Sequence, residues 1–273
     1  MGCTRALVAV AVALLMASPA VADEAWDPAA VAAAWQKENP GWQLDIGPGV
    51  FATPRFPGAA QTRPVPIPYF DLEYKDFFFA SVRDGVGFNL INQNGFKAGP
   101  VANLGFPRRE SYSRYLRALG NVNFTVEAGG FATYMYGPVE IGGEVRRGLG
   151  GHDGTIAEFK ATLYVPISGT VLVGGGPTLK LADDTYMNAY YGISEHQSER
   201  SGKAMFIAGP GLLSAGVNAF GVVKITDKIN LLGFIEYERL LGDAAESPIV
   251  KGPAGSEDQF TGGAAITYQF SWR

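Results

Sequence analysis

The end of the chain constrains its fold more than any other segment, because residues 260–272 alternate strictly between two kinds of side chain. Successive side chains of a β-strand point to opposite faces, so such alternation predicts a strand with two unlike faces. One phase is apolar or glycine and the other is mainly polar or small: Phe260, Gly262, Ala264, Ile266, Tyr268, Phe270 and Trp272 against Thr261, Gly263, Ala265, Thr267, Gln269 and Ser271.

The same period of two recurs along most of the chain. It predicts strands at residues 139–146 and 158–165, and further strands at 43–52, 67–73, 77–82, 86–91, 96–105, 121–136, 169–181, 212–224 and 229–241. Tight turns are predicted at residues 92–95, 136–138 and 226–228, which contain turn-forming residues. About 250 residues at roughly 20 per strand and connection give about 12 strands, an even number as barrel closure requires. We therefore predict an all-β fold, an antiparallel up-and-down β-barrel over residues 43–273, with no domain boundary inside it.

The start of the chain differs from the rest. Arg5 precedes an uncharged apolar run, and Ala20 and Ala22 form a small-residue cleavage site. The run has roughly 12 residues, fewer than the ~20 that span a bilayer, so we predict a signal peptide at residues 1–22 rather than an anchor. Cys3, the only cysteine, is removed with it. The mature chain would then lack disulfides and thiolate nucleophiles.

Residues 23–42 are rich in alanine and do not alternate. We predict a periplasmic lead-in with a short helix, in which Asp27 caps the start and Pro28 takes the first helical position.

Composition favours a wall that meets lipid. Only 18% of the residues are charged, and no basic patch suggests nucleic acid. Residues 161–179 and 204–223 lack charge, but glycine and proline interrupt both, so we do not expect membrane helices there. Alternation alone cannot tell a membrane barrel from a soluble periplasmic one. The signal peptide, the low charge and the aromatic residues at strand ends favour the outer membrane.

Ionisable side chains lie on the polar phases of several predicted strands. A lysine or arginine that faced lipid at mid-bilayer would cost roughly 2–4 kcal/mol, so we expect these groups in the lumen. There they would form either an electrostatic network that plugs and stiffens the barrel or the lining of a cation-preferring pore. The candidates are Glu140, Glu144, Arg146, Glu158, Lys160, Glu236 and Glu238.

Neither histidine indicates a reaction. His152 and His196 lie in separate connections, and neither has a second histidine at ligand spacing. Ser194, Ser198 and Ser201 flank His196, but serines close in sequence are not a triad, and a polar loop explains them equally well. We predict no catalytic residue, no metal and no cofactor.

Three segments carry a family resemblance: residues 137–139, 181–194 and 239–250. From about residue 47 to residue 270 the chain resembles the MipA/OmpV family, the MltA-interacting proteins. The resemblance implies an outer-membrane barrel and, for the namesake, a scaffold that brings a lytic transglycosylase together with a peptidoglycan synthase. The candidate partner or loop residues are Asp183, Asp184, Tyr186, Met187, Asp243, Ser247 and Pro248.

We therefore expect a non-enzymatic scaffold or envelope-structure protein of the outer membrane, in contact with its lipid and linked to peptidoglycan-remodelling enzymes. The alternatives are a small-solute, mildly cation-preferring channel and a rim enzyme built on His152 or His196. Paired charges and large side chains in the lumen favour the scaffold, whereas an open charged passage favours the channel. Family members usually end on an aromatic residue, whereas this chain ends Ser271-Trp272-Arg273.

Overall fold

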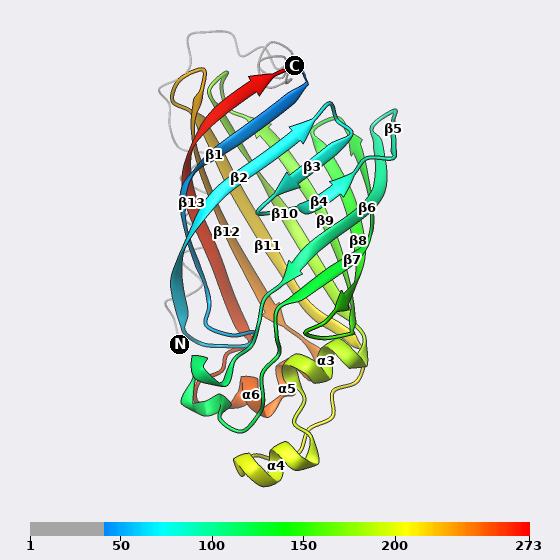
Figure 1. Ribbon diagram of the computed structural model, residues 1–273, viewed down its shortest axis with the longest axis vertical. Coiled ribbons are helices and arrows are strands. Elements are labelled where there is room, and N and C mark those ends of the chain that lie inside the picture. The colour runs from blue at the N-terminus through cyan, green and yellow to red at the C-terminus, as the bar shows by residue number, and fades with distance from the viewer. Residues whose placement is uncertain (1–40) are drawn as a thin grey trace.

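A computed structural model describes residues 41–273 of the chain (Figure 1). The predicted signal peptide and the lead-in helix around Pro28 lie outside these residues. Within residues 41–273, none of the helices is long and apolar enough to cross a membrane.

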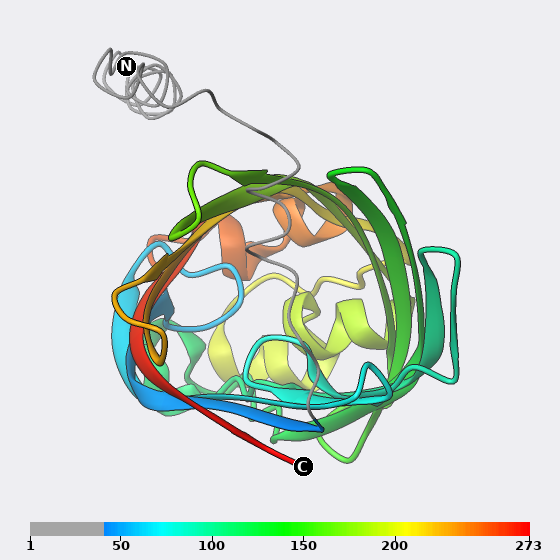
Figure 2. The same ribbon diagram turned by 90° about the horizontal axis from the view of Figure 1, so that it is seen from above.

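The described chain forms one antiparallel sheet that closes on itself (Figure 2). Twelve strands make the ring, because β4 pairs with β6, and β5 adds a short hairpin outside that ring. This confirms the predicted 12-strand barrel. The strands are β1 (Trp42–Pro54), β2 (Thr62–Tyr74), β3 (Phe78–Ser81), β4 (Gly85–Phe88), β5 (Ile91–Gln93), β6 (Phe96–Gly105), β7 (Thr125–Tyr136), β8 (Val139–Leu149), β9 (Thr155–Pro166), β10 (Val171–Ala182), β11 (Gly211–Lys224), β12 (Ile229–Leu240) and β13 (Asp258–Trp272).

The predicted strands correspond to the observed ones apart from their ends and one addition. Residues 92–95, predicted as a connection, contain the end of β5 and the turn that joins it to β6. Asn94 and Gly95 both have positive φ angles, which a tight hairpin turn requires.

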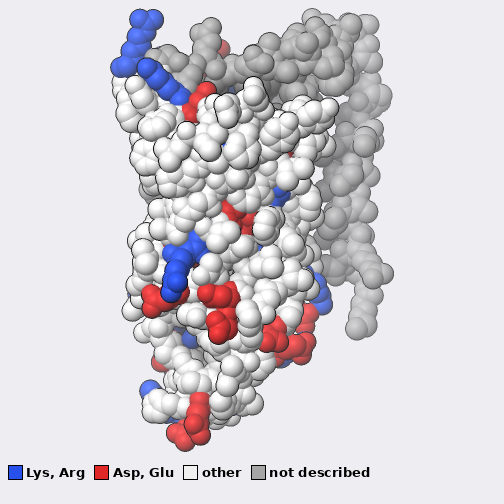
Figure 3. Space-filling model, turned by 90° about the vertical axis from the view of Figure 1, so that its right-hand side faces the viewer, with Lys and Arg blue, Asp and Glu red and all other residues white. Residues whose placement is uncertain are grey.

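The apolar phase of the strands faces outward. Ile141 and Ile235 are 60% and 64% exposed, whereas Ser214 and Thr267, on the polar phases, are 1% exposed. Few charges lie on the visible wall over the upper half, where β13 ends, and charged side chains gather toward the other end (Figure 3). A polar inside and an apolar outside are the arrangement of a barrel in a membrane, so the structure settles which face meets lipid.

Aromatic rings gather where β1 begins and β13 ends. Trp42 and Trp272, opposite each other in the β1–β13 register, stack with centroids 6.2 Å apart, and Tyr74 lies 4.6 Å from Trp42. Such rings form the girdle at a membrane interface. Trp272 is therefore part of this aromatic cluster, one residue before Arg273.

The end of the barrel opposite the start of β1 and the end of β13 carries the longer connections (Figure 1). We call residues 106–124, 183–210 and 241–257 the cap. Its short helices were not predicted, because they lie in connections between strands where turns were expected. They are η1 (Glu110–Tyr112), η2 (Arg114–Leu116), α3 (Asp184–Tyr191), α4 (Glu195–Ser201), α5 (Gly242–Glu246) and α6 (Pro248–Lys251).

Candidate functional site: the capped lumen

The cap has an apolar core of its own. One cluster includes Met187, Tyr190 and Tyr191 of α3, and a second includes Leu116 and Ile249. All five side chains are nearly inaccessible to solvent. Burial also raises the pKa of Tyr190 and Tyr191 well above its ordinary value, because a buried phenolate would lose its hydration. The cap is therefore a folded lid across one end of the ring, as Figure 2 shows.

Asp183 fixes the start of α3 and ties it to the wall. One carboxylate oxygen accepts the backbone N–H of Tyr186 at 2.8 Å, which makes Asp183 the N-cap, and the other accepts the N–H of Thr155 at 2.8 Å. N-cap aspartates satisfy N–H groups that the helix leaves free. A single side chain thus joins the cap to β9.

Ser247 joins the two longest segments of the family resemblance. Its hydroxyl donates to the carbonyl of Tyr191 at 2.6 Å and accepts the N–H of Ile249 at 3.2 Å. Asp243 adds a second tie by accepting the N–H of Gly209 at 2.7 Å. These contacts hold the cap segments to one another.

Arg108 is a buried cation held by carbonyl groups. Its guanidinium donates to the carbonyl of Tyr190 at 2.8 Å and to that of Leu119 at 3.3 Å. Burial lowers the pKa of Arg108, because its positive charge has left water. Sequence patterns could not reveal this residue, since a lone arginine in a polar connection normally faces solvent.

A compact polar cluster lies directly beneath the cap. Arg146 contacts Glu127 at 3.0 Å and also pairs with Glu144, and the Nε2 atom of His152 lies 3.2 Å from Glu127. The ring of His152 packs edge-on against the ring of Tyr186 at 5.0 Å. His152 therefore links the lumen network to the cap.

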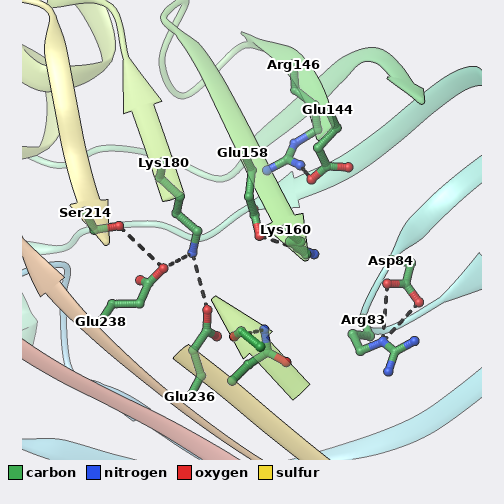
Figure 4. A network of polar contacts seen from close by, with 12 residues as sticks. Arg83, Asp84, Glu144, Arg146, Glu158, Lys160, Lys180, Ser214, Glu236 and Glu238 are labelled. Carbon is green, nitrogen blue, oxygen red and sulfur yellow. Dashed lines mark hydrogen bonds and ion pairs between the residues drawn. The ribbon is translucent and has the colours of Figure 1, made fainter. Parts of the chain in front are cut away.

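The next layer of the lumen centres on Lys180 (Figure 4). Its ammonium group lies 2.5 Å from Glu238 and 3.7 Å from Glu236, which follow each other on the same face of β12. Ser214 of β11 also lies 3.4 Å from Glu238. One lysine thus pairs with two carboxylates from a strand that is not its neighbour.

Two further contacts line the same wall. Lys160 pairs with Glu158 at 3.2 Å, two residues earlier on β9. Farther from the cap, the hydroxyl of Tyr164 donates to Glu140 at 3.4 Å.

The turn between β3 and β4 brings one more ion pair toward these residues (Figure 4). Arg83 contacts Asp84 at 3.1 Å and lies over the ring of Phe220 on β11, 5.8 Å from its centroid. The side chains of Arg83 and Asp84 are 61% and 43% exposed. This part of the lumen therefore has room for water.

All seven predicted lumen residues make polar contacts inside the barrel: Glu140, Glu144, Arg146, Glu158, Lys160, Glu236 and Glu238. Sequence reasoning did not single out Lys180, although it alternates with Leu179 and Leu181 on a predicted strand. Sequence reasoning also missed Arg83 and Asp84, because the sequence of a turn does not show whether the turn folds into the lumen.

The predicted partner residues are divided between the surface and the core of the cap. Asp184 and Asp243 are exposed, whereas Met187 and Ser247 are buried and reach no partner while the cap is folded. Tyr186 and Pro248 are half-buried.

The serines near His196 serve the backbone. Ser194 accepts the N–H of Gln197 in a capping box at the start of α4, and Ser198 donates to the carbonyl of Lys203 at 2.6 Å. Among residues 41–273, no group of three or more histidine, cysteine, aspartate or glutamate side chains could hold a metal.

The family model described as MltA-interacting protein MipA matches residues 46–270. No curated protein sequence matches the chain significantly.

Solved barrels resemble it only distantly. The NanC porin is 8% identical over 82% of this chain and 98% of that chain, with a TM-score of 0.40. The COG4313 outer membrane channel from Pseudomonas putida F1 is 9% identical over 84% and 96%, with a TM-score of 0.43. The CymD monoaromatic hydrocarbon channel is 10% identical over 86% and 89%, with a TM-score of 0.41. Similarity this low carries no argument about function.

Proposed function

The chain belongs to the MipA family of MltA-interacting proteins, and from this premise we propose that it is a non-enzymatic scaffold of the outer membrane. In this proposal the barrel anchors a peptidoglycan-remodelling enzyme at the membrane, and its lumen carries no current.

The pairing of the lumen charges carries this proposal. Lys180 contacts two glutamates, and Arg146 contacts two more, so all four carboxylates are held in ion pairs with cations of the wall, although two negative charges remain unbalanced. Such contacts between strands stiffen a barrel, whereas a conducting pore needs charges that are free to meet ions.

The lengths of the connections suggest which end meets the partner. Barrels of this class have short periplasmic turns and longer extracellular loops. The cap would then face outward, and the end with the short turns, where β1 begins and β13 ends, would face the periplasm, where peptidoglycan lies (Figure 1). We propose that the partner binds this turn-bearing end and that the family segments in the cap serve its folding.

Blocking one end at a time tests the proposal. Gly137, in the β7–β8 turn, and Gly202, at the end of α4, both have open space where a side chain would lie. Both also have positive φ angles, so a cysteine strains the backbone at each and the two sites are matched in that cost. Streptavidin bound to biotin on Gly137→Cys should abolish capture of a purified lytic transglycosylase by residues 23–273, whereas the same block on Gly202→Cys should not. Capture that only the Gly202→Cys block abolishes, or no capture by the unblocked protein, would overturn the proposal.

The alternative is a cation-preferring channel, and the exposed pair of Arg83 and Asp84 favours it. Water around this pair would have to continue past Lys180 and through the cap for ions to cross.

A further inference from the structure

The barrel wall is interrupted between β2 and β6. β2 pairs with β3 only from Asp71 to Tyr74, and β4 pairs with β6 only at Val86 and Gly87. Within the described chain, residues 62–69 of β2 therefore have no strand partner on the side away from β1 (Figure 1). An unpaired strand edge at membrane depth is costly, so its presence needs an explanation.

The sequence of β2 keeps this edge from pairing. Pro64, Pro66 and Pro68 alternate along it, opposite Ala52, Val50 and Pro48 of β1. Opposed residues of antiparallel strands alternate between pairs that exchange N–H···O bonds and pairs that do not, and proline, which has no N–H, fits only the second kind. The nitrogen side of all three prolines therefore faces the open edge. Proline is compatible with an unpaired strand edge, because it has no N–H group to leave unsatisfied. For the same reason it prevents another strand from forming a full set of hydrogen bonds with this edge.

The open edge lies at the height of the lipid-facing band. Pro66 is opposite Val50, which is opposite Ala264, which in turn is opposite Gly233. Val50 is 49% exposed on the outer wall. The break is thus part of the apolar outer surface and does not belong to either rim.

Apolar side chains continue from this edge into the lumen. Val65 and Ile67 alternate with the prolines and point inward, and Phe51 lies opposite Val65. The ring of Phe51 meets that of Phe234 edge-on at 5.3 Å. We call these four residues the inner strip. The lumen of a membrane barrel is ordinarily polar, and the wall around Lys180 is, so the inner strip departs from that pattern beside the break.

Local contacts bound the break at both ends. At the end away from the cap, the N–H of Val82 donates to the carbonyl of Phe70 at 3.2 Å. Toward the cap, the guanidinium of Arg63 lies over the ring of Tyr112 at 4.4 Å. The interruption therefore has a defined frame.

We propose that this break is a lateral opening through which hydrocarbon chains from the surrounding lipid reach the inner strip. The continuity of the outer apolar band with the inner strip argues for lipid as the occupant. A second copy of the chain is disfavoured, because the prolines offer it no N–H donors. This access is independent of the scaffold role and of whether the lumen conducts ions along its axis.

Tryptophan quenching by brominated lipid tests the opening. In residues 23–273 with Trp26, Trp35, Trp42 and Trp272 replaced by Phe, a single tryptophan is placed at Ile67 and the barrel is refolded into vesicles of dibrominated phosphatidylcholine. Heat-modifiable gel mobility verifies that each variant folds. If Ile67→Trp does not fold, Val65→Trp is used in its place.

Two matched positions calibrate the result. Leu231 points outward and is 40% exposed, whereas its neighbour Leu232 points inward on a strand that is paired on both sides. We expect Ile67→Trp to lose at least half as large a fraction of its emission as Leu231→Trp, and Leu232→Trp to lose little. Emission from Ile67→Trp as insensitive to brominated lipid as that from Leu232→Trp would overturn the lateral opening, and it would leave the binding test of the scaffold role unaffected.

Discussion

Ser247 donates its hydroxyl hydrogen to the carbonyl of Tyr191 at 2.6 Å, although the two residues lie 56 positions apart in the sequence. Both are buried, so Ser247→Ala would leave the carbonyl of Tyr191 and the N–H of Ile249 without this partner. An unsatisfied buried polar group costs about 1–3 kcal/mol. We expect the cap of Ser247→Ala to be cleaved faster by a protease in limited digestion of the refolded barrel.

Ser111→Ala is the control for that experiment, because Ser111 is exposed and lies in the same cap. Equal cleavage rates for the two variants and the unchanged protein would show that the Ser247 hydroxyl does not hold the cap.

Lys180→Met should destabilise the barrel, because it leaves Glu236 and Glu238 side by side without their cation. Removing one partner of a buried ion pair costs about 3–5 kcal/mol, and these side chains keep roughly a fifth of their surface exposed, so we expect about 3 kcal/mol. Urea unfolding in lipid vesicles measures this loss. Adding Glu238→Gln should restore part of it, and a double variant less stable than Lys180→Met alone would contradict the pairing.

The cap should open in alkali. Burial raises the pKa of Tyr190 and Tyr191 above the value of about 10 that tyrosine has when unfolded. Their stabilising contribution is therefore complete below pH ~10 and declines as the pH rises above it, because the unfolded state then loses protons that the folded state keeps. After a jump to high pH, phenolate absorbance should show a slow phase that Tyr190→Phe diminishes.

Tyr136, which is 77% exposed, provides the comparison. Tyr136→Phe should leave the amplitude of the slow phase unchanged. Loss of fast amplitude alone in Tyr190→Phe would show that Tyr190 is accessible in the folded cap.

Gly263→Ala should destabilise the barrel because Gly263 makes room for the inner strip. A methyl group there would overlap a ring carbon of Phe51 and would lie 2.7 Å from one of Phe234. Overpacking of this kind costs about 1–3 kcal/mol. Gly233→Ala is the control, because the nearest atom to its methyl group would be 3.8 Å away. Equal unfolding midpoints for the two variants would contradict the packing.

Most of the fold could be predicted from the alternation of side chains, because a period of two locates a strand and its two faces without tertiary information. Alternation could not show which phase faces outward, because a soluble barrel has the same two phases. The exposure of residues such as Ile141 and Ile235 in the structure showed that the apolar phase does. The helices of the cap were missed although Asp183 and the Ser194–Gln197 pair are recognisable capping residues.

The lumen residues were easier to anticipate than their partners. Because exposure to lipid is too costly for Glu236 and Glu238, the sequence predicts both in the lumen. That Lys180 lies beside them follows only from the closed ring of strands. Likewise the prolines of β2 were visible in the sequence, yet their role depends on β3 and β4 being too short to cover that edge.

Single-channel recording of residues 23–273 in a planar bilayer tests the central claim most directly, with Glu140 and Glu144 replaced by Gln in a parallel preparation. A lumen closed by paired charges and a folded cap predicts a barrel that inserts, as heat-modifiable mobility would show, and stays silent. Stable current steps whose cation preference falls in the Glu140→Gln, Glu144→Gln variant would contradict it and establish a channel.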